Sequence, residues 1–247
     1  MTPALKKRVH SLLNAGLFAL ACLILLVATL RFSLADPSGG QISFNSTSGV
    51  TIPNPGNRSD AGGTVNYINM GATQQDSAWK AYVGNVSGLL TLDDVNANTI
   101  YDWTLSSIVG RVFASRNNSI TWSVINCSNQ TVVDSDQAAV SFASSDSDSV
   151  NRTFSNTNHK SFLVASRNMS GCRSTALWIN DTVQAIGPSS LFQEILLSDG
   201  TNMVYTTIIE PTNPQGFDGK TRNFQLIVPQ SKTTQTPTLY YFYVELG

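Results

Sequence analysis

The chain has 247 residues, a formal net charge of −1 and only 13% charged side chains. This weak charge excludes the concentrated basic surface that nucleic-acid-binding proteins carry. Four of the 15 basic residues but none of the 16 acidic residues precede residue 36, so the remainder of the chain has a net charge of −5. With 41% hydrophobic residues, the chain is long enough to bury a substantial core.

The first 35 residues have the pattern of a membrane-directing segment. A basic cluster, Lys6-Lys7-Arg8, precedes an apolar run from Leu12 to Leu30 that only Asn14 interrupts. As a helix, this run would extend roughly 28 Å, which is close to the hydrocarbon thickness of a bilayer. This length favours an uncleaved transmembrane anchor. The small residues of Ser33-Leu34-Ala35 instead suit cleavage of a signal peptide before Asp36.

Both alternatives predict the same orientation. The positive-inside rule keeps the basic cluster in the cytoplasm and places residues 36–247 outside. We therefore predict either a single-pass protein of the cell membrane with its C-terminal body outside, or a protein secreted to the cell surface. Cys22 lies inside the apolar run and is interpreted as a membrane-buried thiol.

The residues after the apolar run fall into two regions. Residues 36–63 are rich in Gly, Ser, Pro and Asn and are predicted to form a stalk, in which Gln41–Phe44 is a candidate strand. Residues 64–247 contain short runs of β-forming residues at regular intervals, each bounded by turn residues such as Asp199-Gly200. We expect this second region to be one exported β domain.

The expected strands are short and rich in β-branched and aromatic residues. They are Val65–Ile68, Trp79–Val83, Leu89–Leu92, Ile100–Leu105, Val109–Ala114, Ile120–Ile125, Phe162–Ser166, Thr175–Ile179, Phe192–Leu197, Met203–Ile209, Asn223–Val228 and Leu239–Leu246. Asp93–Thr99 and Ser115–Ser119 are expected to be hairpin loops. This pattern predicts an all-β fold, an antiparallel β-sandwich of jelly-roll or immunoglobulin-like type that follows the N-terminal transmembrane or signal helix.

Two segments stand out from this pattern. Ser145–Phe154 is the best helix candidate, with Ser145, Asp146 or Ser147 as its N-cap. The last expected strand alternates cleanly, so we expect it to lie within the sheet. One of its faces would carry Tyr240, Phe242, Val244 and Leu246, and the other Leu239, Tyr241, Tyr243 and Glu245.

The exported region contains two cysteines, Cys127 and Cys172, which are 45 residues apart. Two thiols in an oxidising compartment usually pair. The alternatives are a metal site and a catalytic nucleophile, but two cysteines with no neighbouring histidine make a poor zinc site. We therefore predict a disulfide.

Nine Asn-x-Ser/Thr sequons occur, about twice the number expected by chance. They begin at Asn45, Asn57, Asn85, Asn117, Asn126, Asn129, Asn151, Asn168 and Asn180. We predict that several carry glycans if the host glycosylates, and that Asn126 and Asn129 are too close for both to be fully occupied.

Several residues are candidates for catalysis, and each has a simpler interpretation. His159 is the only histidine after the apolar run, so any Ser-His-Asp triad would need it, but its polar neighbours favour a solvated loop histidine. Glycosidase chemistry would need two carboxylates across a cleft. The chain has three glutamates, Glu194, Glu210 and Glu245, and a group of aspartates, Asp93, Asp94 and Asp102, whose place near a hairpin end is common for Asp.

Two further patterns suggest ligands. Asp134-Ser-Asp136 and Asp146-Ser-Asp148 could supply oxygen ligands to Ca²⁺, but both lack the glycine and distal glutamate of a twelve-residue calcium loop. Four tryptophans could stack on sugars, although Trp103 and Trp122 lie in expected strands, which favours the core. The four are Trp79, Trp103, Trp122 and Trp178. We expect no catalytic residue, no bound metal and no cofactor.

The stretch Trp79–Asp94, continuing to Tyr101-Asp102-Trp103, resembles exported cell-surface proteins predicted from archaeal genomes. The segments Cys172-Arg-Ser-Thr and Thr238–Gly247 share this likeness, which covers most of Thr73–Gly247. That family is largely uncharacterised. The resemblance implies a location at the cell surface, and it implies no activity and no catalytic residue.

These observations together predict a structural or adhesive cell-surface glycoprotein, membrane-tethered or secreted, without catalytic activity. The alternatives are a subunit of an extracellular filament and a carbohydrate-binding surface module. The expected partners are the membrane, through the N-terminal helix, and other copies, surface proteins or glycans outside the cell. Nucleic acid is not expected as a partner.

Overall fold

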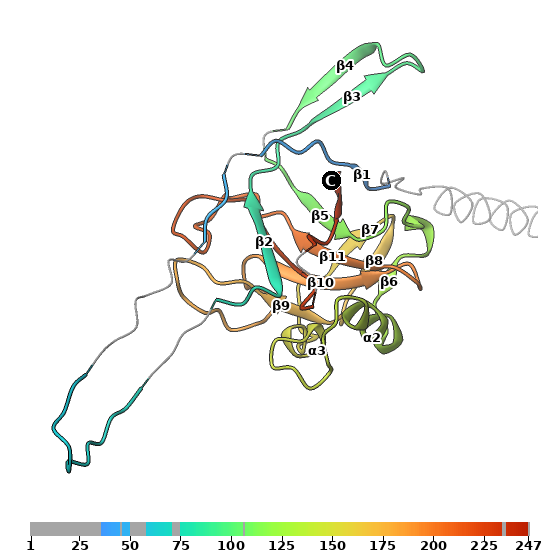
Figure 1. Ribbon diagram of the computed structural model, residues 1–247. Helices are drawn as coiled ribbons and strands as arrows, with labels where there is room; N and C mark the ends of the chain where they lie inside the picture. Colours follow the sequence, from blue (N-terminus) through green and yellow to red (C-terminus); the bar gives the residue numbers. More distant parts are fainter. Residues whose placement is uncertain are drawn as a thin grey trace, which may run out of the picture. The chain divides into compact units, whose positions relative to one another are not determined.

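The computed structural model describes residues 36–44, 46–49, 58–70, 75–105, 107–233 and 236–246 (Figure 1). The apolar N-terminal run and the sequons at Asn45 and Asn57 lie outside these residues, so what the sequence predicts for them stays a prediction. Within the described ranges, no helix has both the length and the apolar character needed to cross a bilayer.

Short strands make up most of the regular structure. In chain order they are β1 (Ser38–Gly39), β2 (Trp79–Gly84), β3 (Leu89–Asp93), β4 (Thr99–Thr104), β5 (Gly110–Ser115), β6 (Asn126–Cys127), β7 (Phe162–Val164), β8 (Arg167–Met169), β9 (Ser174–Ala176), β10 (Gln193–Ser198), β11 (Met203–Ile208), β12 (Phe224–Pro229) and β13 (Tyr241–Leu246). Among the described residues, the helical elements are the 3₁₀ helix η1 (Trp122–Val124) and the helices α2 (Gln130–Ala139) and α3 (Val150–Thr153).

The largest sheet has the order β1-β13-β5-β11-β10-β6, and β9 also pairs with β10. Three two-stranded ladders, β2–β12, β3–β4 and β7–β8, complete the pairing of the named strands among the described residues. Strands β5, β11 and β10 lie side by side in this sheet (Figure 1). Every one of these pairs is antiparallel, which confirms the predicted all-β, antiparallel class.

The central strands of this sheet are buried on both faces. In β10, Ile195 and Leu197 belong to one core cluster and Leu196 to the other, because side chains alternate along a strand. On the first face, Trp122 of η1 and Met169 of β8 join the core. On the second face, residues of β12, α2 and α3 join it. Every residue of β10 and β11 is buried, because layers cover the sheet on both sides.

The C-terminal strand lies inside the sheet, as its alternation predicts. β13 pairs with β5 over six residues and with β1 over two. Its side chains reach both cores: Phe242 contacts Tyr82 at 4.9 Å between ring centroids, and Tyr243 contacts Trp122 at 5.3 Å. Both faces of β13 thus contribute to packing.

Two strands predicted before residue 70 were wrong. The stalk contributes the two-residue strand β1, whereas the candidate strand Gln41–Phe44 is exposed and unpaired within the described chain. Val65–Ile68 is likewise exposed and forms no strand. Strand preference depends on a neighbouring strand and a surface to pack against. The described residues provide neither for these two segments.

The expected hairpin around Ser115–Ser119 was also wrong. Strand β5 pairs on one edge with β11 and on the other with β13, so no edge is left for the segment that follows it. The predicted strand Ile120–Ile125 instead forms η1, which places Trp122 in the core. Strands β11 and β13, which are distant in the sequence, pair with β5 in place of the segment that directly follows it.

The helices differ from the prediction as well. Helix α3 is short, and its N-cap is Ser149 rather than Ser145, Asp146 or Ser147. Helix α2 was not predicted. It begins after Asn129, whose Oδ1 accepts a hydrogen bond from the backbone N–H of Val132 at 2.9 Å. This is the usual role of an N-cap asparagine.

Candidate functional site

The aspartates of one candidate calcium segment, Asp146 and Asp148, are paired with a lysine. Nζ of Lys232 lies 3.0 Å from Oδ2 of Asp146 and 2.7 Å from Oδ1 of Asp148, and it also lies over the ring of Phe142. The hydrogen bond to Asp148, together with that to Asp146, raises the pKa of Lys232. A protonated ammonium therefore already lies between the two carboxylates that a calcium ion would use, and it offsets one of their two negative charges.

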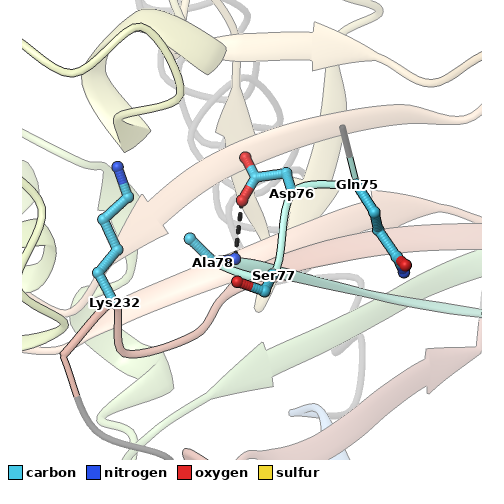
Figure 2. A pocket seen from close by; sticks show the side chains of 5 residues that line it. All are labelled: Gln75, Asp76, Ser77, Ala78 and Lys232. Carbon is cyan, nitrogen blue, oxygen red and sulfur yellow. Dashed lines mark hydrogen bonds between the residues drawn. The ribbon is translucent and has the colours of Figure 1, made fainter. Parts of the chain in front are cut away.

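A hollow of about 400 Å³ lies beside this lysine and is lined by Gln75–Ala78 and Lys232. Lys232 lies across the hollow from Gln75, and the carboxylate of Asp76 accepts a hydrogen bond from the backbone N–H of Ala78 at 2.7 Å (Figure 2). Burial raises the pKa of Asp76, and a hydrogen bond to Asp148 raises it further. Within the described ranges, no group of three or more His, Cys, Asp or Glu residues is arranged to hold a metal ion.

The other candidate calcium segment, Asp134-Ser-Asp136, is divided between two environments. Asp134 is exposed and accepts a hydrogen bond from Nε2 of Gln130 at 2.8 Å. Asp136 is buried and accepts one from the hydroxyl of Tyr205 at 2.6 Å. Arg116 forms an ion pair with the same carboxylate. Because residues i and i+2 of a helix face different directions, Asp134 and Asp136 cannot share a ligand.

A second hollow, of about 330 Å³, lies over the Arg116–Asp136 pair. Its lining is polar and includes Asn117 and Asn202, whose side-chain amides are hydrogen-bonded to each other at 2.9 Å. The carboxylate of Asp136 outweighs the effect of burial and raises the pKa of Arg116. Since the charged groups already pair with each other, this hollow presents a neutral, hydrogen-bonding surface.

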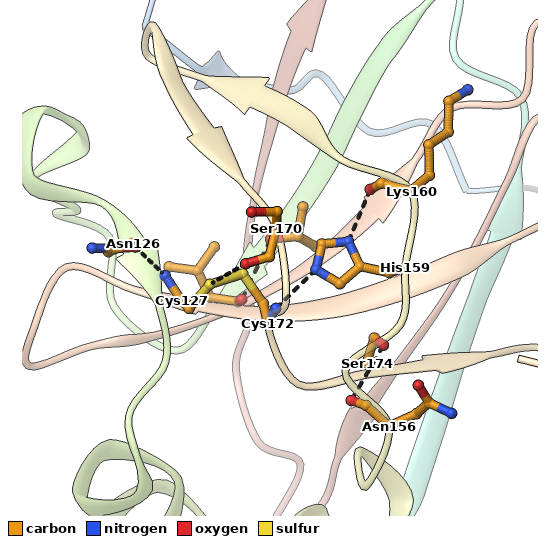
Figure 3. The surroundings of a disulfide bond; sticks show 10 residues. Asn126, Cys127, Asn156, His159, Lys160, Ser170, Cys172 and Ser174 are labelled. Carbon is orange, nitrogen blue, oxygen red and sulfur yellow. Dashed lines mark hydrogen bonds between the residues drawn. A yellow bond between two sulfur atoms is a disulfide. The ribbon is translucent and has the colours of Figure 1, made fainter. Parts of the chain in front are cut away.

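His159 is buried and structural, so the prediction of a solvated loop histidine was wrong. Figure 3 shows its ring between two backbone groups. Nε2 accepts a hydrogen bond from the N–H of Cys172 at 2.9 Å, so Nδ1 carries the proton and donates to the carbonyl of Lys160 at 2.8 Å. With both ring nitrogens occupied by the backbone, His159 holds the chain around Cys172.

The predicted disulfide between Cys127 and Cys172 is confirmed (Figure 3). Cys172 is fully buried in the first core cluster, and Cys127 belongs to β6, which pairs with Leu197 of β10. The bond therefore fastens a two-residue edge strand to the segment that follows β8.

The three glutamates lie on different elements, and each accepts a hydrogen bond from a backbone N–H of another segment. Glu194, in β10, accepts from Ile227 at 2.8 Å. Glu210 follows β11 and accepts from Phe192 at 3.0 Å, and Glu245 accepts from Ala165 at 3.3 Å. Burial raises the pKa of all three carboxyl groups. Their common role is structural, and they do not face one another across a cleft as a glycosidase pair would.

Replacing the most deeply buried of them, Glu194→Gln, should flatten the dependence of stability on pH. Because burial raises its pKa, native Glu194 keeps a proton that the unfolded chain releases near pH 4.3. Stability therefore falls as pH rises from the unfolded-state pKa toward the native one. In that interval the free energy of unfolding of the wild type should fall by about 1.4 kcal/mol for each pH unit because of this group. The variant should not show this decrease.

Urea unfolding of both proteins at about pH 5 and about pH 8 measures this difference. Glu210→Gln is the matched control: its carboxyl is less buried than that of Glu194, so its effect should be smaller. A parallel loss of stability in the wild type and in Glu194→Gln would contradict the assignment.

The four tryptophans divide into packed and exposed pairs. Trp122 is buried as expected, and Trp79 is half-buried and donates from Nε1 to the carbonyl of Asp148 at 2.8 Å. Trp178 and Trp103 are about half exposed. For Trp103 the expectation of a core position was wrong, because its ladder β3–β4 does not join the large sheet.

The β3–β4 ladder is a hairpin with one predominantly apolar face. Leu90 pairs with Trp103 and Leu92 pairs with Tyr101, so these four side chains share one face. Between 46% and 59% of each remains exposed, and the rings of Tyr101 and Trp103 touch at 5.0 Å. The opposite face carries the Thr91–Asp102 pair and also Leu89, which is 56% exposed.

The loop of this hairpin is held by Asp94. Its carboxylate accepts hydrogen bonds from the backbone N–H groups of Asn96 and Asn98, and its own N–H donates to the carbonyl of Asn98. The side-chain amide of Asn98 also donates to this carboxylate at 2.9 Å, and this hydrogen bond, followed by that from the backbone N–H of Asn98, lowers the pKa of Asp94. The hairpin predicted around Asp93–Thr99 thus forms, with Val95 fully exposed at its tip.

Seven of the nine sequons fall within the described residues. Five asparagines are exposed: Asn85, Asn126, Asn129, Asn168 and Asn180. Asn151 and Asn117 are half-buried, and Nδ2 of Asn117, the atom that would carry a glycan, donates to Asn202. Occupancy of the seven stays a prediction, and Asn117 is the least suited of them.

Two features of functional interest were not predicted. The Arg116–Asp136–Tyr205 contact joins the residue that follows β5 to α2 and β11, and no local spacing links residues so far apart. The exposure of the β3–β4 face was also missed, because an alternating strand has the same pattern whether or not another layer covers it.

The chain matches no protein-family model. Neither the curated proteins nor the solved structures include a significant match to it. The likeness to surface proteins predicted from archaeal genomes therefore stays a prediction, and any function has to be argued from the residues themselves.

Proposed function

We propose that this protein is a structural or adhesive glycoprotein of the cell surface, membrane-tethered or secreted, without catalytic activity. One observation carries the proposal: the β3–β4 hairpin exposes four large apolar side chains on a single face. Contiguous exposed apolar surface of this kind marks contact sites on soluble proteins. The protein acts through contact with other molecules, using a hairpin rather than a cleft.

The chemistry of the remaining candidates supports this proposal. The glutamates and His159 are hydrogen-bonded to backbone groups, and Asp146 and Asp148 both form ion pairs with Lys232. The disulfide suits an oxidising compartment outside the cytoplasm. The exposed sequons suit a surface that carries glycans.

The fold is of the kind used by many surface proteins. The β2–β12 ladder packs on one face of the large sheet through the second core cluster, which supports the finer proposal of a β-sandwich. Such domains serve as rigid carriers of exposed loops and hairpins.

Labelling of intact cells tests the proposed location. A membrane-impermeant amine reagent should modify Lys160 and Lys220, which are exposed on the body. Lys6 and Lys7 should stay unmodified, because they either remain in the cytoplasm or are removed with a signal peptide. They are therefore a control within the same chain. Labelling of Lys160 and Lys220 only after lysis would contradict a surface location.

A filament subunit is the second candidate, and exposed apolar residues before β2 favour it. Val65, Tyr67, Ile68 and Met70 are all exposed in an extended segment. Such a segment could add as a strand to the sheet of a neighbouring copy. A contact that repeats head to tail generates a filament, whereas a twofold contact closes after two copies. Electron microscopy of the purified protein distinguishes the two.

A further inference from the structure

The β3–β4 hairpin is a poor structure for a chain that remains alone in water. An isolated two-stranded hairpin is marginally stable and usually needs another layer against its apolar face. Here that face, formed by Leu90, Leu92, Tyr101 and Trp103, remains about half exposed. At its base, an ideal Cβ on Gly88 would lie 2.4 Å from Cδ1 of Leu246, so the hairpin begins in close contact with β13. The hairpin is thus anchored at its base while its apolar face is open.

The charges around this face limit what can cover it. No Lys or Arg occurs between Lys80 and Arg111, and the four residues of the face carry no charge. Asp102 lies on the opposite face, and Asp93 and Asp94 lie at the loop. Insertion of the tip into a membrane would take these carboxylates out of water, which is costly. A neutral, apolar protein surface is the better occupant.

The same face of another copy meets these requirements. We propose that two copies of this chain pack their β3–β4 hairpins face to face, so that Leu90, Leu92, Tyr101 and Trp103 of one copy contact the same residues of the other. Twofold contacts are by far the commonest in homo-oligomers and bring identical patches together. In this arrangement the Asp102 side chains point away from the contact, so like charges do not meet.

The composition of the face agrees with this role. Tyr and Trp are enriched among the residues that dominate protein contacts, because they bury a large area at a low cost in conformational entropy. The hairpin from Leu89 to Thr104 also contains no sequon, so a glycan would not be attached to the contact surface. This inference rests on the proposed function in one respect, which is that the β3–β4 hairpin is the contact surface. It adds that the partner is a second copy of the chain.

Cysteine cross-linking in the full chain tests the contact, with neighbouring residues as matched controls. Leu90→Cys and Leu92→Cys place a thiol on the apolar face, whereas Thr91→Cys places one on the opposite face. After treatment of intact cells with a short bifunctional maleimide, we expect dimers from the first two variants. Their yield should exceed that of Thr91→Cys at least tenfold, and adding Trp103→Ser should abolish it. The wild type measures any background from Cys22.

The outcomes separate the occupants. Equal dimer yields from Leu90→Cys and Thr91→Cys, or no dimer from either Leu90→Cys or Leu92→Cys, would overturn the proposal. Cross-links from Leu90→Cys to a different protein would overturn it as well, although the surface location measured by lysine labelling would stand. Sedimentation velocity provides an independent measurement: Trp103→Ser should shift the purified protein toward the monomer, while Asp102→Asn should not.

Discussion

Deletion of Thr238–Gly247 is expected to abolish folding of the exported body. The deletion removes β13 from its place between β5 and β1 and exposes the edge of β5 over six residues. It also removes Tyr240, which is buried and donates from its hydroxyl to the carbonyl of Pro229 at 2.7 Å. Both core clusters lose aromatic contacts, because Phe242 packs on Tyr82 and Tyr243 on Trp122.

The size of this loss decides the outcome. Burial of each large side chain contributes roughly 1.5–3 kcal/mol, and β13 with Tyr240 contributes several such side chains. The total approaches the stability of a typical domain, about 5–15 kcal/mol. Limited proteolysis of the exported protein measures the result. We expect rapid, complete digestion of the truncated chain.

A second deletion provides the control. Removing Val65–Met70 takes out a segment of similar apolar content that is exposed and forms no described strand. That variant should keep the protease-resistant body. If the chain without Thr238–Gly247 were also compact and resistant, β13 would not be part of the folding unit, and its role would be to bind a partner.

Loss of the disulfide should destabilise the body by about 4 kcal/mol, as expected when a 45-residue loop is no longer closed in the unfolded chain. Cys127→Ser and Cys172→Ser should have similar effects, because either change opens the same loop. Cys172→Ser should cost somewhat more, since Cys172 is the more deeply buried of the two. The midpoint of urea unfolding measures both effects.

Chemical mapping supports this measurement. Peptide mapping without reductant should find one linked pair, with no free thiol at Cys127 or Cys172. Reduction of the wild-type protein should reproduce the instability of the serine variants. Alkylation of both cysteines under native, oxidising conditions would show that the bond does not form.

Alternation and turn residues in the sequence predicted most of the strands. The hairpin at Asp93–Thr99 was predicted correctly because its loop is local: Asp94 makes its hydrogen bonds within four residues. The pairing of β5 was not predictable in this way, because both of its edges are taken by strands from the C-terminal half of the chain. Non-local competition of this kind leaves no signal in a short window.

Helix α2 shows a different failure. The sequence contains a suitable N-cap at Asn129 and apolar residues at Val132 and Val133, but this Asn also begins a sequon and was interpreted only in that role. The structural role of His159 was missed for another reason. Its partners are backbone atoms of Lys160 and Cys172, and backbone groups have no sequence signature.

The position of β1 has a mechanical consequence for a protein held by its N-terminus, as proposed. Tension along the tether reaches the body first at Ser38–Gly39, which is joined to β13 over only two residues. This short strand should peel away before β2 is loaded, because the next strand among the described residues begins at Trp79. The roughly 40 residues between them would then extend by up to about 140 Å. The region before β2 would act as an extensible linker, and the sheet would bear load only after this linker is fully extended.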